Sequence, residues 1–430
     1  MTPTRRSLLA TPLATGLAAS PSWAAPNAPS AAALLERYVA FGDKASGGAG
    51  DMACGEWMAA WLNDRGFVLE RQAFDAPFFE IEEAWLQVGE ARAAVIPQAI
   101  VTPTGPEGIS GPILVRAPED AGAPAGGAIV IVKLPYARWS SALSPAVRGP
   151  VQAALSAGAR AVVLITTGPS GEALALNADG RAPLFRSPVA VLAPKDAPAL
   201  IAAAKSGVAG VLKVTGRGGR RPSFNLIGRR DRGHGQWLVV STPRSGWFTC
   251  AGERGPGVAV WMMLADWASR SKLPVDLAFV CNSGHEYENL GAQHLLDAAA
   301  PPPDRTRLWL HLGANVAARD WHELGGRLAP LPSADPQRFL MATDELLPAC
   351  RAAFSGLPGL ETPYALGGAA TGELAHIAAA GYRRVAGIFG AHRLHHAAID
   401  DGRCLEAKPV EAVFLATRRL LEERGALAPI

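Results

Sequence analysis

The segment 275–298 changes from a strand pattern to a helix pattern across a short polar turn, and this constrains the fold more than any other feature. Its largely apolar run 275–280 is bounded by proline and asparagine, as in a buried strand. From Leu290 onward, apolar residues recur at helical spacing. The turn 283–288 reads Ser-Gly-His-Glu-Tyr-Glu, and ligands of open α/β sheets bind just beyond such strand ends. The turn is therefore a candidate site, and an ordinary polar loop is the alternative.

The chain has 430 residues, of which 49% are hydrophobic, so it is long enough for two domains with large cores. Its formal net charge of +3 excludes the basic footprint expected of a protein that binds nucleic acid. Basic residues are dense only at 217–221 and again at 229–232, and glycine and proline lie among the first group. We expect this stretch to be a solvated linker.

Residues 1–24 have the features of a twin-arginine signal peptide. Arg5 and Arg6 precede a mildly apolar run, and Ser-Trp-Ala at 22–24 fits a cleavage site with small residues. The run is too short and too weakly apolar to span a bilayer. We therefore expect a mature chain that starts near Ala25, is not inserted in a membrane, and works in the periplasm or outside the cell.

The five cysteines lack the paired spacing of a cysteine zinc site. Their number is odd, so at least one thiol has no partner within the chain. Cys250 and Cys281 lie near strand ends at the same expected sheet edge, and export permits disulfides. We expect these two residues to be buried apolar side chains or a disulfide with each other, in preference to nucleophiles.

Three regions of the chain differ in their pattern. Residues 25–75 predict two amphipathic helices and a strand, and residues 222–430 alternate strands with helices. This alternation predicts an α/β fold with a mostly parallel sheet covered by helices on both faces. Residues 76–216 instead contain many short β-like runs divided by glycine and proline, with helices expected at 150–156 and 197–205.

The middle region has two pieces with a distinctive order. Gly-Ala-Ile-Val-Ile-Val at 127–132 is followed by a helix that leads into Ala-Gly-Ala-Arg-Ala-Val-Val at 157–163. This order resembles the protease-associated domain that is inserted in several exported or membrane peptidases. The resemblance implies a β-rich insert at 76–216 that contributes no catalytic residue and acts in substrate gating or interaction.

A series of motifs follows in the rest of the chain. They are Asn-Leu-Ile-Gly at 225–228, Val-Val-Ser-Thr-Pro-Arg-Ser at 239–245, Gly-Glu-Arg-Gly-Pro-Gly at 252–257, Gly-His-Glu at 284–286, and His396 followed by Asp400. Their order resembles that of the co-catalytic zinc aminopeptidase family, which includes bacterial leucyl aminopeptidases, glutamate carboxypeptidases, glutaminyl cyclases and the catalytically inactive transferrin receptor. The resemblance covers residues 31–75 and 222–430, and it implies a three-layer α/β fold of the zinc aminopeptidase type with an inserted domain.

Several positions depart from the ligand set that the resemblance implies. Thr242 stands at the first zinc histidine, and Arg244 stands at the aspartate after it. Glu253 stands at the zinc-bridging aspartate, and Arg254 stands at its asparagine partner. His285 replaces the first glutamate of a pair, which is the general base in the family.

Other positions keep a ligand. Glu286 matches the second glutamate of the pair, which is a zinc ligand in the family. His396 matches the last ligand, with His395 as an alternative after a shift of one residue. The aspartate expected after the next strand has no clear counterpart, and His311 is the nearest residue that can bind a metal. We expect Glu286 and His396 to share one pocket at a sheet edge.

Two closely spaced zinc ions need several carboxylates to offset their charge and to bridge them. Arg244 and Arg254 would add positive charge instead, so we expect at most one zinc per chain. Three ligands plus water make a catalytic zinc site. The expected ligands are Glu253, Glu286, His396 and His311. The alternative is a metal-free network in which Arg254 and Arg244 pair with the two glutamates.

These residues leave three functions open. One is an exported hydrolase of the aminopeptidase type with one metal, in which His285 or Glu286 is the base. Another is a metal-free hydrolase in which Glu253 and Glu286 act as a pair on a glycan-like substrate. The apolar platforms for such a substrate would be Trp247, Trp309 and Trp321. The third is a non-catalytic binding protein, which the fold permits in the transferrin receptor.

The ligand is expected to be a small-molecule, peptide or glycan substrate, and the oligomeric state is left open. Ser241 and Ser283 lack the Gly-x-Ser-x-Gly surroundings of a nucleophilic serine. The candidate catalytic residues are His285, Glu286 and Glu253. The candidate substrate-binding residues are Arg254, Arg244, Tyr287 and Trp247.

Overall fold

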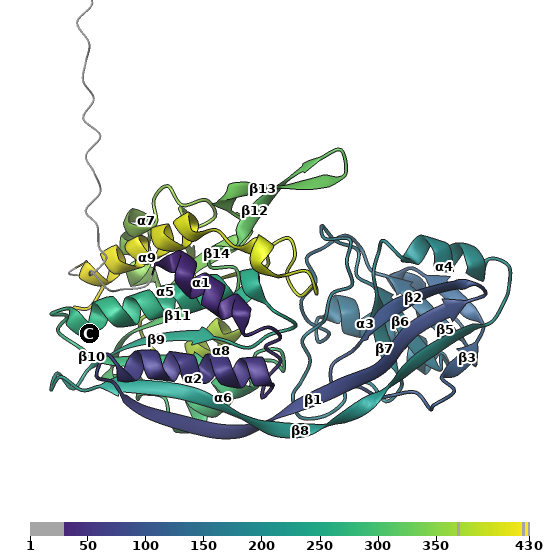
Figure 1. The fold of residues 1–430 in the computed structure, drawn as a ribbon, viewed down its shortest axis with the longest axis horizontal. Coiled ribbons are helices and arrows are strands. Elements are labelled where there is room, and N and C mark those ends of the chain that lie inside the picture. The colour runs from purple at the N-terminus through teal and green to yellow at the C-terminus, as the bar shows by residue number, and fades with distance from the viewer. Residues whose placement is uncertain (1–29, 368–369, 424–425, 429–430) are drawn as a thin grey trace, which may run out of the picture.

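The computed structural model describes residues 30–367, 370–423 and 426–428, so the expected signal peptide at 1–24 lies outside the described residues. Two lobes lie side by side, joined by a long two-stranded ribbon (Figure 1). The ribbon consists of β1 (Val68–Val88) and β8 (Gly210–Arg230), which pair antiparallel along their whole length. None of the helices in the described part of the chain combines the length and apolar character needed to span a bilayer.

The larger lobe is built on a mostly parallel sheet, as expected from the sequence. Its strands β10 (Asp276–Asn282), β9 (Trp237–Pro243), β11 (Thr306–Leu312) and β16 (Val385–Gly390) lie next to one another and are all parallel. At one side β8 pairs antiparallel with β10. At the other side the sheet continues with β14 (Arg338–Ala342) and β15 (Tyr364–Ala365). The expected α/β fold with a mostly parallel sheet is therefore confirmed.

Helices cover both faces of this sheet (Figure 1). One face carries α1 (Ala31–Ala40), α2 (Ala49–Asn63), α5 (Ala251–Arg270), α7 (Leu347–Ala353) and α9 (Ala407–Glu422). The other face carries α6 (Leu290–Ala298) and α8 (Glu373–Ala379). The Ser30 hydroxyl accepts a hydrogen bond from the Ala33 N–H at 3.2 Å, which caps the start of α1. The short turns are η1 (Pro118–Asp120), η2 (Pro303–Arg305), η3 (Asp344–Leu346) and η4 (Gly402–Cys404).

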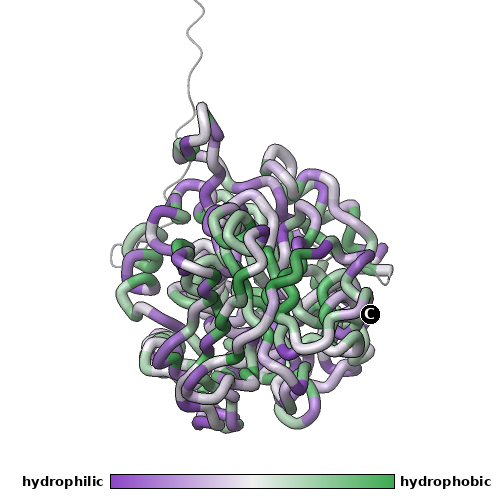
Figure 2. The backbone as a smooth tube through the Cα atoms, turned by 90° about the vertical axis from the view of Figure 1, so that its right-hand side faces the viewer, coloured by the Kyte–Doolittle hydropathy of each residue, from purple (hydrophilic) through white to green (hydrophobic). Residues whose placement is uncertain are grey.

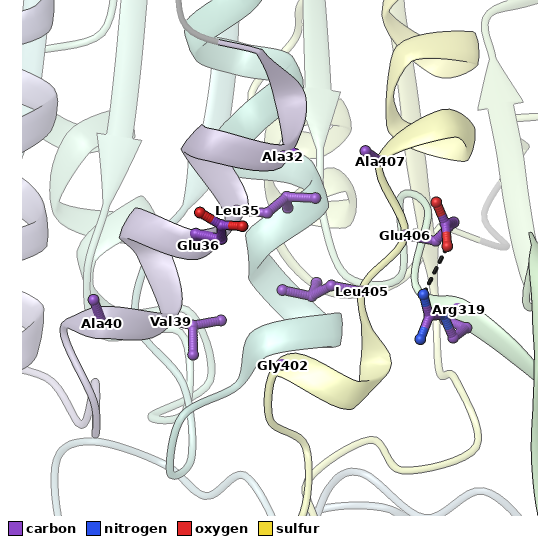
Figure 3. Close-up of a pocket in the computed structure, with 10 residues that line it drawn as sticks. All are labelled: Ala32, Leu35, Glu36, Val39, Ala40, Arg319, Gly402, Leu405, Glu406 and Ala407. Carbon is purple, nitrogen blue, oxygen red and sulfur yellow. Dashed lines mark hydrogen bonds and ion pairs between the residues drawn. The ribbon is translucent and has the colours of Figure 1, made fainter.

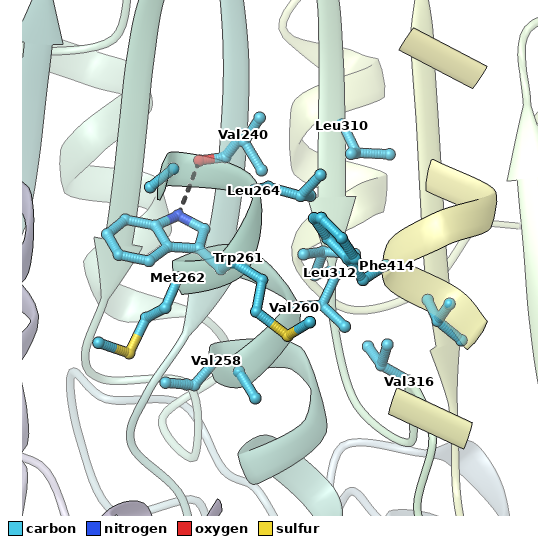
Figure 4. Close-up of a cluster of buried hydrophobic side chains, with 14 of the residues drawn as sticks. Val240, Val258, Val260, Trp261, Met262, Leu264, Leu310, Leu312, Val316 and Phe414 are labelled. Atoms are coloured by element: carbon cyan, nitrogen blue, oxygen red, sulfur yellow. Dashed lines mark hydrogen bonds between the residues drawn. The ribbon is translucent and has the colours of Figure 1, made fainter. Parts of the chain in front are cut away.

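The helix α5 forms the centre of the core. Nearly all of its residues are buried, because it is sandwiched between the sheet and the helices α1 and α9. Its Trp261 packs among aliphatic side chains, and the indole N–H donates to the Val240 carbonyl at 3.0 Å (Figure 4). The buried indole N–H is thereby satisfied, so this large side chain fixes α5 against β9 without leaving an unpaired donor.

The smaller lobe has its own sheet. Strands β4 (Ile113–Arg116), β5 (Ile129–Lys133), β6 (Ala161–Ile165) and β7 (Val189–Leu192) are parallel, and β2 (Ala91–Pro97) pairs antiparallel with β7. The short β3 (Ile109–Gly111) pairs with β8. The helices α3 (Pro145–Ser156) and α4 (Ala197–Ala204) pack against different apolar clusters of this lobe. Viewed from this end, hydrophobic segments gather at the centre and hydrophilic ones at the periphery (Figure 2).

Residues 217–220 are exposed, as expected, but the expectation of a linker at 217–221 is wrong, because these residues lie inside β8. Glu80 pairs with Arg217 across the ribbon, both in register and as an ion pair at 2.6 Å. Arg220 donates to the Gly180 carbonyl at 2.6 Å, so this side chain also has a defined hydrogen-bond partner. The sequence pattern misled because the partners of these two arginines, Glu80 and Gly180, lie 137 and 40 residues away in the chain. The division of the chain near 76 and 216 falls within two continuous strands, and it stays a prediction.

A small hairpin, β12 (Arg319–Leu324) and β13 (Arg327–Ala334), projects from the larger lobe (Figure 1). Its tip residues are exposed. A surface groove of about 490 Å³ lies elsewhere, between α1 and the start of α9 (Figure 3). The candidate site residues named from the sequence are absent from the lining of this groove.

Candidate active site

The carboxyl ends of the parallel strands carry a dense group of polar side chains, which are buried except for the slightly exposed His285. The loop after β9 supplies Ser245, the loop after β10 supplies His285 and Glu286, and the segment after β16 supplies His395 and His396. The first turns of α5, which follows β9, add Glu253 and Arg254. This is the edge at which open α/β sheets bind their ligands.

Glu253 forms the centre of one cluster. Its Oε1 atom accepts a hydrogen bond from the Arg254 guanidinium and lies 3.4 Å from Nε2 of His396. The ring of His395 stacks on that of His396 with centroids 3.9 Å apart. Glu253, His395 and His396 each offer a ligand atom within 4.8 Å of the other two. The structure thus brings together Glu253 with both histidines that the sequence named for the last ligand position.

Charges within the cluster set its protonation. Burial opposes ionisation of Glu253, but Arg254 and the neighbouring imidazoles outweigh burial and hold the pKa of this carboxyl well below its ordinary range. Burial, together with the adjacent His396, holds the pKa of His395 well below its ordinary value. At neutral pH the cluster therefore presents a carboxylate and a neutral His395 ring.

Several polar atoms of this cluster have no hydrogen-bond partner among the described residues. They are Oε2 of Glu253, Nη1 of Arg254, Nδ1 of His395 and Nδ1 of His396. A buried polar atom that stays unpaired costs about 1–3 kcal/mol, so such atoms are rare in a packed core. Their concentration at one sheet edge indicates a place that is built to meet a ligand.

Asp400 anchors the start of α5 and with it the position of Glu253. Its two carboxylate oxygens accept the N–H groups of Gly252 and Glu253, at 2.7 Å and 3.1 Å, and the ring of His392 lies 3.1 Å from the second oxygen. A side chain at position 252 would place its Cβ 2.9 Å from Asp400, so glycine is required there. These contacts satisfy N–H groups at the start of α5 and fix the direction of Glu253.

Glu286 belongs to a different cluster. Its carboxylate accepts the Ser46 N–H at 2.6 Å and the Ser245 hydroxyl at 2.9 Å, and the residue is fully buried. Burial raises the pKa of Glu286, although the hydrogen bonds from Ser46 act in the opposite direction. Glu286 and His396 lie at the same sheet edge, but Glu286 is not in the ligand group that Glu253 forms with His395 and His396.

His285 has a partner that the sequence did not suggest. Its Nδ1 atom lies 3.4 Å from Oε1 of Glu373, at the start of α8, and Asn282 donates to the same carboxylate at 3.0 Å. Burial opposes ionisation of Glu373, but the His285 hydrogen bond and the charge of His311 outweigh it and lower its pKa to about 2. Burial and Arg254 lower the pKa of His285, and Glu373 acts against them. The pair is therefore an ionised carboxylate beside a neutral imidazole.

His311 lies outside the ligand group of Glu253. Its Nδ1 atom lies 2.9 Å from the Ser241 hydroxyl, which in turn accepts the indole N–H of Trp309 at 2.8 Å. Because the Trp309 N–H donates to Ser241, the serine proton is free to point at His311. Burial lowers the pKa of His311 to about 4, so the ring is neutral at pH 7.

Arg244 is part of the core. Its guanidinium forms an ion pair with Asp51 at 2.9 Å, with both side chains fully buried, and also donates to the Phe224 carbonyl at 2.8 Å. Of the expected metal-free network, the Arg254–Glu253 pair is present, but Arg244 does not pair with Glu286. Asp51 also accepts the hydroxyls of Ser223 and Ser283. Because its guanidinium already has these buried partners, Arg244 is not available as a surface contact.

The tryptophans are dispersed. Trp247 packs edge-to-face on Tyr287 with ring centroids 6.1 Å apart, and its indole N–H donates to Asn177 of the smaller lobe at 2.9 Å. Trp309 is fully buried in the sheet of the larger lobe, and Trp321 lies on the β12–β13 hairpin. The three residues therefore do not form a shared platform for a sugar.

The smaller lobe covers the site. The Ala178 N–H donates to the Glu286 carbonyl at 3.1 Å, and the Ala175 N–H donates to the His396 carbonyl at 3.0 Å. The Ser141 hydroxyl also donates to Glu288. Backbone from the smaller lobe thus contacts both the loop that carries Glu286 and the segment that carries His396.

All five cysteines belong to the described part of the chain, and all are buried with free thiols. The expected alternative of a disulfide between Cys250 and Cys281 is therefore wrong, and the expectation of buried apolar residues is confirmed. Burial raises the pKa of Cys250 above its ordinary value and that of Cys281 to about 12. Thiols held in the protonated form are poor nucleophiles.

Comparison with known proteins bears on the fold. No protein-family model and no curated protein sequence matches the chain. Among solved structures, a peptidase M28 precursor from Shewanella amazonensis SB2B superimposes with a TM-score of 0.72 at 17% identity, covering 93% of each chain. The zinc aminopeptidase BSAP from Bacillus subtilis gives 0.69 at 17% identity, covering 91% of this chain and 94% of its own. An aminopeptidase from Aneurinibacillus sp. strain AM-1 gives 0.63 at 16% identity, covering 92% and 96%.

The chain has the zinc-aminopeptidase fold. The superpositions extend over more than nine-tenths of the chain, so they include most of the smaller lobe as well. At these identities the likeness establishes the fold alone, and the chemistry has to be judged from the side chains.

Two of the positions that depart from the ligand set implied by the resemblance have side chains with partners of their own. The Thr242 hydroxyl, at the position where the resemblance implies the first zinc histidine, donates to the Leu312 carbonyl at 2.8 Å. The Arg254 guanidinium pairs with Glu253 and donates to the Ser245 carbonyl at 3.2 Å. A fixed positive charge therefore lies between the start of α5 and the loop after β9. A second divalent cation beside this charge would be strongly disfavoured.

A single ion fits the donor set better. Glu253, His395 and His396 supply one carboxylate and two imidazoles, which is a ligand set that zinc accepts in catalytic sites. The unpartnered Glu253 Oε2 and the unpartnered Nδ1 atoms of both histidines are available for it. His392, Asp400 and Cys404 form another close group, but the Asp400 oxygens already serve Gly252, Glu253 and His392.

Proposed function

We propose that the chain is a hydrolase of the aminopeptidase type that cleaves amide bonds of peptide-like substrates with at most one bound metal. The observation that carries this proposal is the cluster of Glu253, His395 and His396, whose unpartnered buried atoms lie at the ligand-binding edge of a zinc-aminopeptidase fold. Solved structures with this fold include a zinc aminopeptidase and an aminopeptidase, which favours peptide substrates.

In this proposal Glu253, His395 and His396 hold the ion. Bound zinc would polarise the substrate carbonyl and lower the pKa of a water molecule. His285 would accept the proton from the attacking water through Nε2, because its Nδ1 atom faces the ionised Glu373 and must carry the other proton. The unpartnered Nη1 of Arg254 would donate to the negative charge that develops on the carbonyl oxygen.

The other functions considered from the sequence are supported less well. A metal-free hydrolase would need Glu253 and Glu286 to face one substrate, yet each carboxylate has its own set of partners. The dispersed tryptophans also argue against a glycan platform. The unpartnered buried atoms would serve a non-catalytic binding protein equally well. An activity measurement therefore has to distinguish a binding protein from a hydrolase.

The test combines metal analysis with kinetics on aminoacyl 4-nitroanilides. We expect no more than one zinc per chain, loss of activity with a chelator, and recovery when zinc is restored. His285→Gln should lower kcat at least about 100-fold with little change in KM, since a general base contributes at least that factor. The matched control is His322→Gln on the exposed hairpin, which should leave the kinetics unchanged.

Two outcomes would reject the proposal. Activity that survives complete removal of metal would point to the metal-free hydrolase. Absence of hydrolysis for every aminoacyl and peptide substrate, in protein that contains its metal, would favour the binding protein.

We also propose that residues 76–216 form a protease-associated-like domain that gates the site and that the chain is exported by the twin-arginine route. The contacts of Ala175 and Ala178 with the site loops support gating. For export, replacing Arg5 and Arg6 by lysine should retain the protein in the cytoplasm, whereas replacing the nearby Ser7 by alanine should not. Equal export of both variants would reject this route.

A further inference from the structure

A cavity of about 280 Å³ lies between the two lobes, beside the site edge. The larger lobe contributes Trp247, Phe248 and Tyr287 to its wall. The ribbon contributes Phe78, and the segment after β2 contributes Ile100. Most of these side chains are aromatic and none of the five is charged, so the wall is suited to an apolar group.

The cavity is connected to the candidate active site through the chain and through hydrogen bonds. Tyr287 directly follows Glu286 in sequence. Arg221, which also lines the cavity, donates to the Ser46 carbonyl at 2.8 Å, and the Ser46 N–H donates to the Glu286 carboxylate at 2.6 Å. A group in the cavity would therefore lie next to the loops that carry Glu286 and His285.

Two residues of the wall have backbone conformations that L-residues rarely adopt. Ile100 has φ +47° and Phe248 has φ +58°. A β-branched residue such as isoleucine is strained in this region, at a cost of about 1–3 kcal/mol. Strain of this kind persists where surrounding contacts hold it in place, and it collects at ligand-binding sites. The two strained residues come from different lobes and face the same cavity.

The size of the cavity limits what it can hold. A dry apolar cavity of about 150 Å³ accommodates benzene, whereas sites for whole drug-sized ligands begin near 300 Å³. A volume of about 280 Å³ therefore suits one aromatic side chain with its adjoining backbone. The charged residues that also line the cavity, Asp43, Glu80 and Arg221, are of mixed sign, so they do not favour a charged occupant.

We propose that the interlobe cavity is the specificity pocket for an aromatic or large apolar side chain of the substrate. Cleavage of such a substrate rests on the function proposed above, but binding of the side chain does not. The smaller lobe supplies part of the wall, so this specificity depends on both lobes. The pocket also gives Trp247 and Tyr287 a defined role as contacts for the substrate side chain.

Calorimetry with simple amino-acid amides tests the pocket without relying on catalysis. L-Phenylalaninamide should bind at least about tenfold more tightly than L-alaninamide or L-lysinamide, because an added methylene alone is worth about that much in an apolar pocket. Ala99→Trp, which fills the cavity, should abolish the preference and leave the affinity for L-alaninamide unchanged. The matched control is Ala32→Trp, which fills the unrelated groove between α1 and α9 (Figure 3).

A second variant covers the case in which Ala99→Trp does not fold. Phe78→Ala removes one wall and should weaken L-phenylalaninamide binding about tenfold, with no effect on L-alaninamide. Equal affinities for the three amides would overturn the pocket, even if the protein hydrolyses aminoacyl anilides. If both variants remove the preference for L-phenylalaninamide, the pocket is supported. If the same protein hydrolyses no substrate, the hydrolase is rejected while the pocket stands.

Discussion

Nδ1 of His285 lies 3.4 Å from Oε1 of Glu373, although 88 residues separate the two in the chain. The carboxylate is ionised and can only accept a hydrogen bond, so it fixes the proton of the imidazole on Nδ1. The opposite ring nitrogen is then an acceptor. The imidazole retains slight exposure, 13% for its side chain, whereas Glu373 is completely enclosed. A base held by a buried carboxylate is the usual arrangement for proton transfer in hydrolases.

The first prediction concerns this pair. Glu373→Gln should lower kcat about tenfold, because the amide no longer selects one tautomer. Glu373 raises the pKa of His285, so its removal should lower that pKa further and move the acid limb of the kcat profile to lower pH. In the wild type this limb should already lie below pH 6.5, since the net shift of His285 is downward. A purely structural role for Glu373 would reduce kcat without moving the limb.

A second prediction separates the two candidate sets of metal ligands. Glu253→Gln should weaken zinc binding at least about 100-fold, since even outer-shell partners of a metal are worth up to that factor. Glu286→Gln should leave zinc content unchanged, because its carboxylate belongs to the Ser46 and Ser245 cluster. Elemental analysis of both variants gives the answer. Loss of zinc in both would support the ligand set expected from the sequence, in which Glu286 is a ligand.

The sequence located much of this site because its motifs are local. The turn that carries His285 and Glu286 lies directly after a strand, and the edge at which it ends follows from the parallel topology. Glu253 and His396 were likewise identified from short motifs. Glu373 and Ser46 were missed because their partners lie 88 and 240 residues away, and neither has a recognisable local pattern. Glu373 is the only acid of α8, and its burial becomes visible only in the structure.

Element boundaries failed where distant contacts decide them. The apolar periodicity of the sequence predicts a helix over 257–269, but α5 begins at Ala251, and Asp400 accepts N–H groups of its first turn from 148 residues away. The sequence also predicts a single helix over 344–354, but the structure divides this stretch into η3 and α7. The alternation of strands and helices still gave the correct fold class, since that pattern depends only on local periodicity.

The paired ribbon leads to a third prediction. Trypsin acting on the mature chain should cut after Arg327, at the exposed tip of the β12–β13 hairpin, before it cuts after Arg217, Arg220 or Arg221. A paired strand has to open locally before a protease can bind it. Arg327 is the first residue of β13 and pairs only beside the exposed turn, whereas 217–221 lie inside the long β1–β8 ribbon, so less pairing has to open at Arg327. Arg327→Gln should delay the first cut. A first cut within 217–221, seen by mass spectrometry, would restore the view that this stretch is a linker.

The fourth prediction tests the role of the buried guanidinium beside Glu253. Arg254→Gln removes a positive charge next to the candidate ligands, so zinc should bind at least about tenfold more tightly. The substituted protein should nevertheless hydrolyse substrate more slowly, because Nη1 of Arg254 is proposed to meet the carbonyl oxygen. Arg327→Gln on the hairpin is the matched control for loss of one positive charge. Unchanged zinc affinity in Arg254→Gln would show that this charge does not limit metal binding.

The last prediction concerns acid stability and rests on His311. Burial lowers its pKa to about 4, whereas an unfolded histidine has a pKa near 6.5. Between those values the unfolded chain binds a proton that the folded chain does not, so folding stability should fall as the pH decreases from about 6.5 to about 4, by about 3 kcal/mol in total. His311→Asn cannot titrate, so urea unfolding of the metal-free protein should show a shallower loss over this range. His322→Asn on the exposed hairpin should keep the wild-type slope. Equal slopes for wild type and His311→Asn would mean that His311 is protonated in the folded protein as readily as in the unfolded chain.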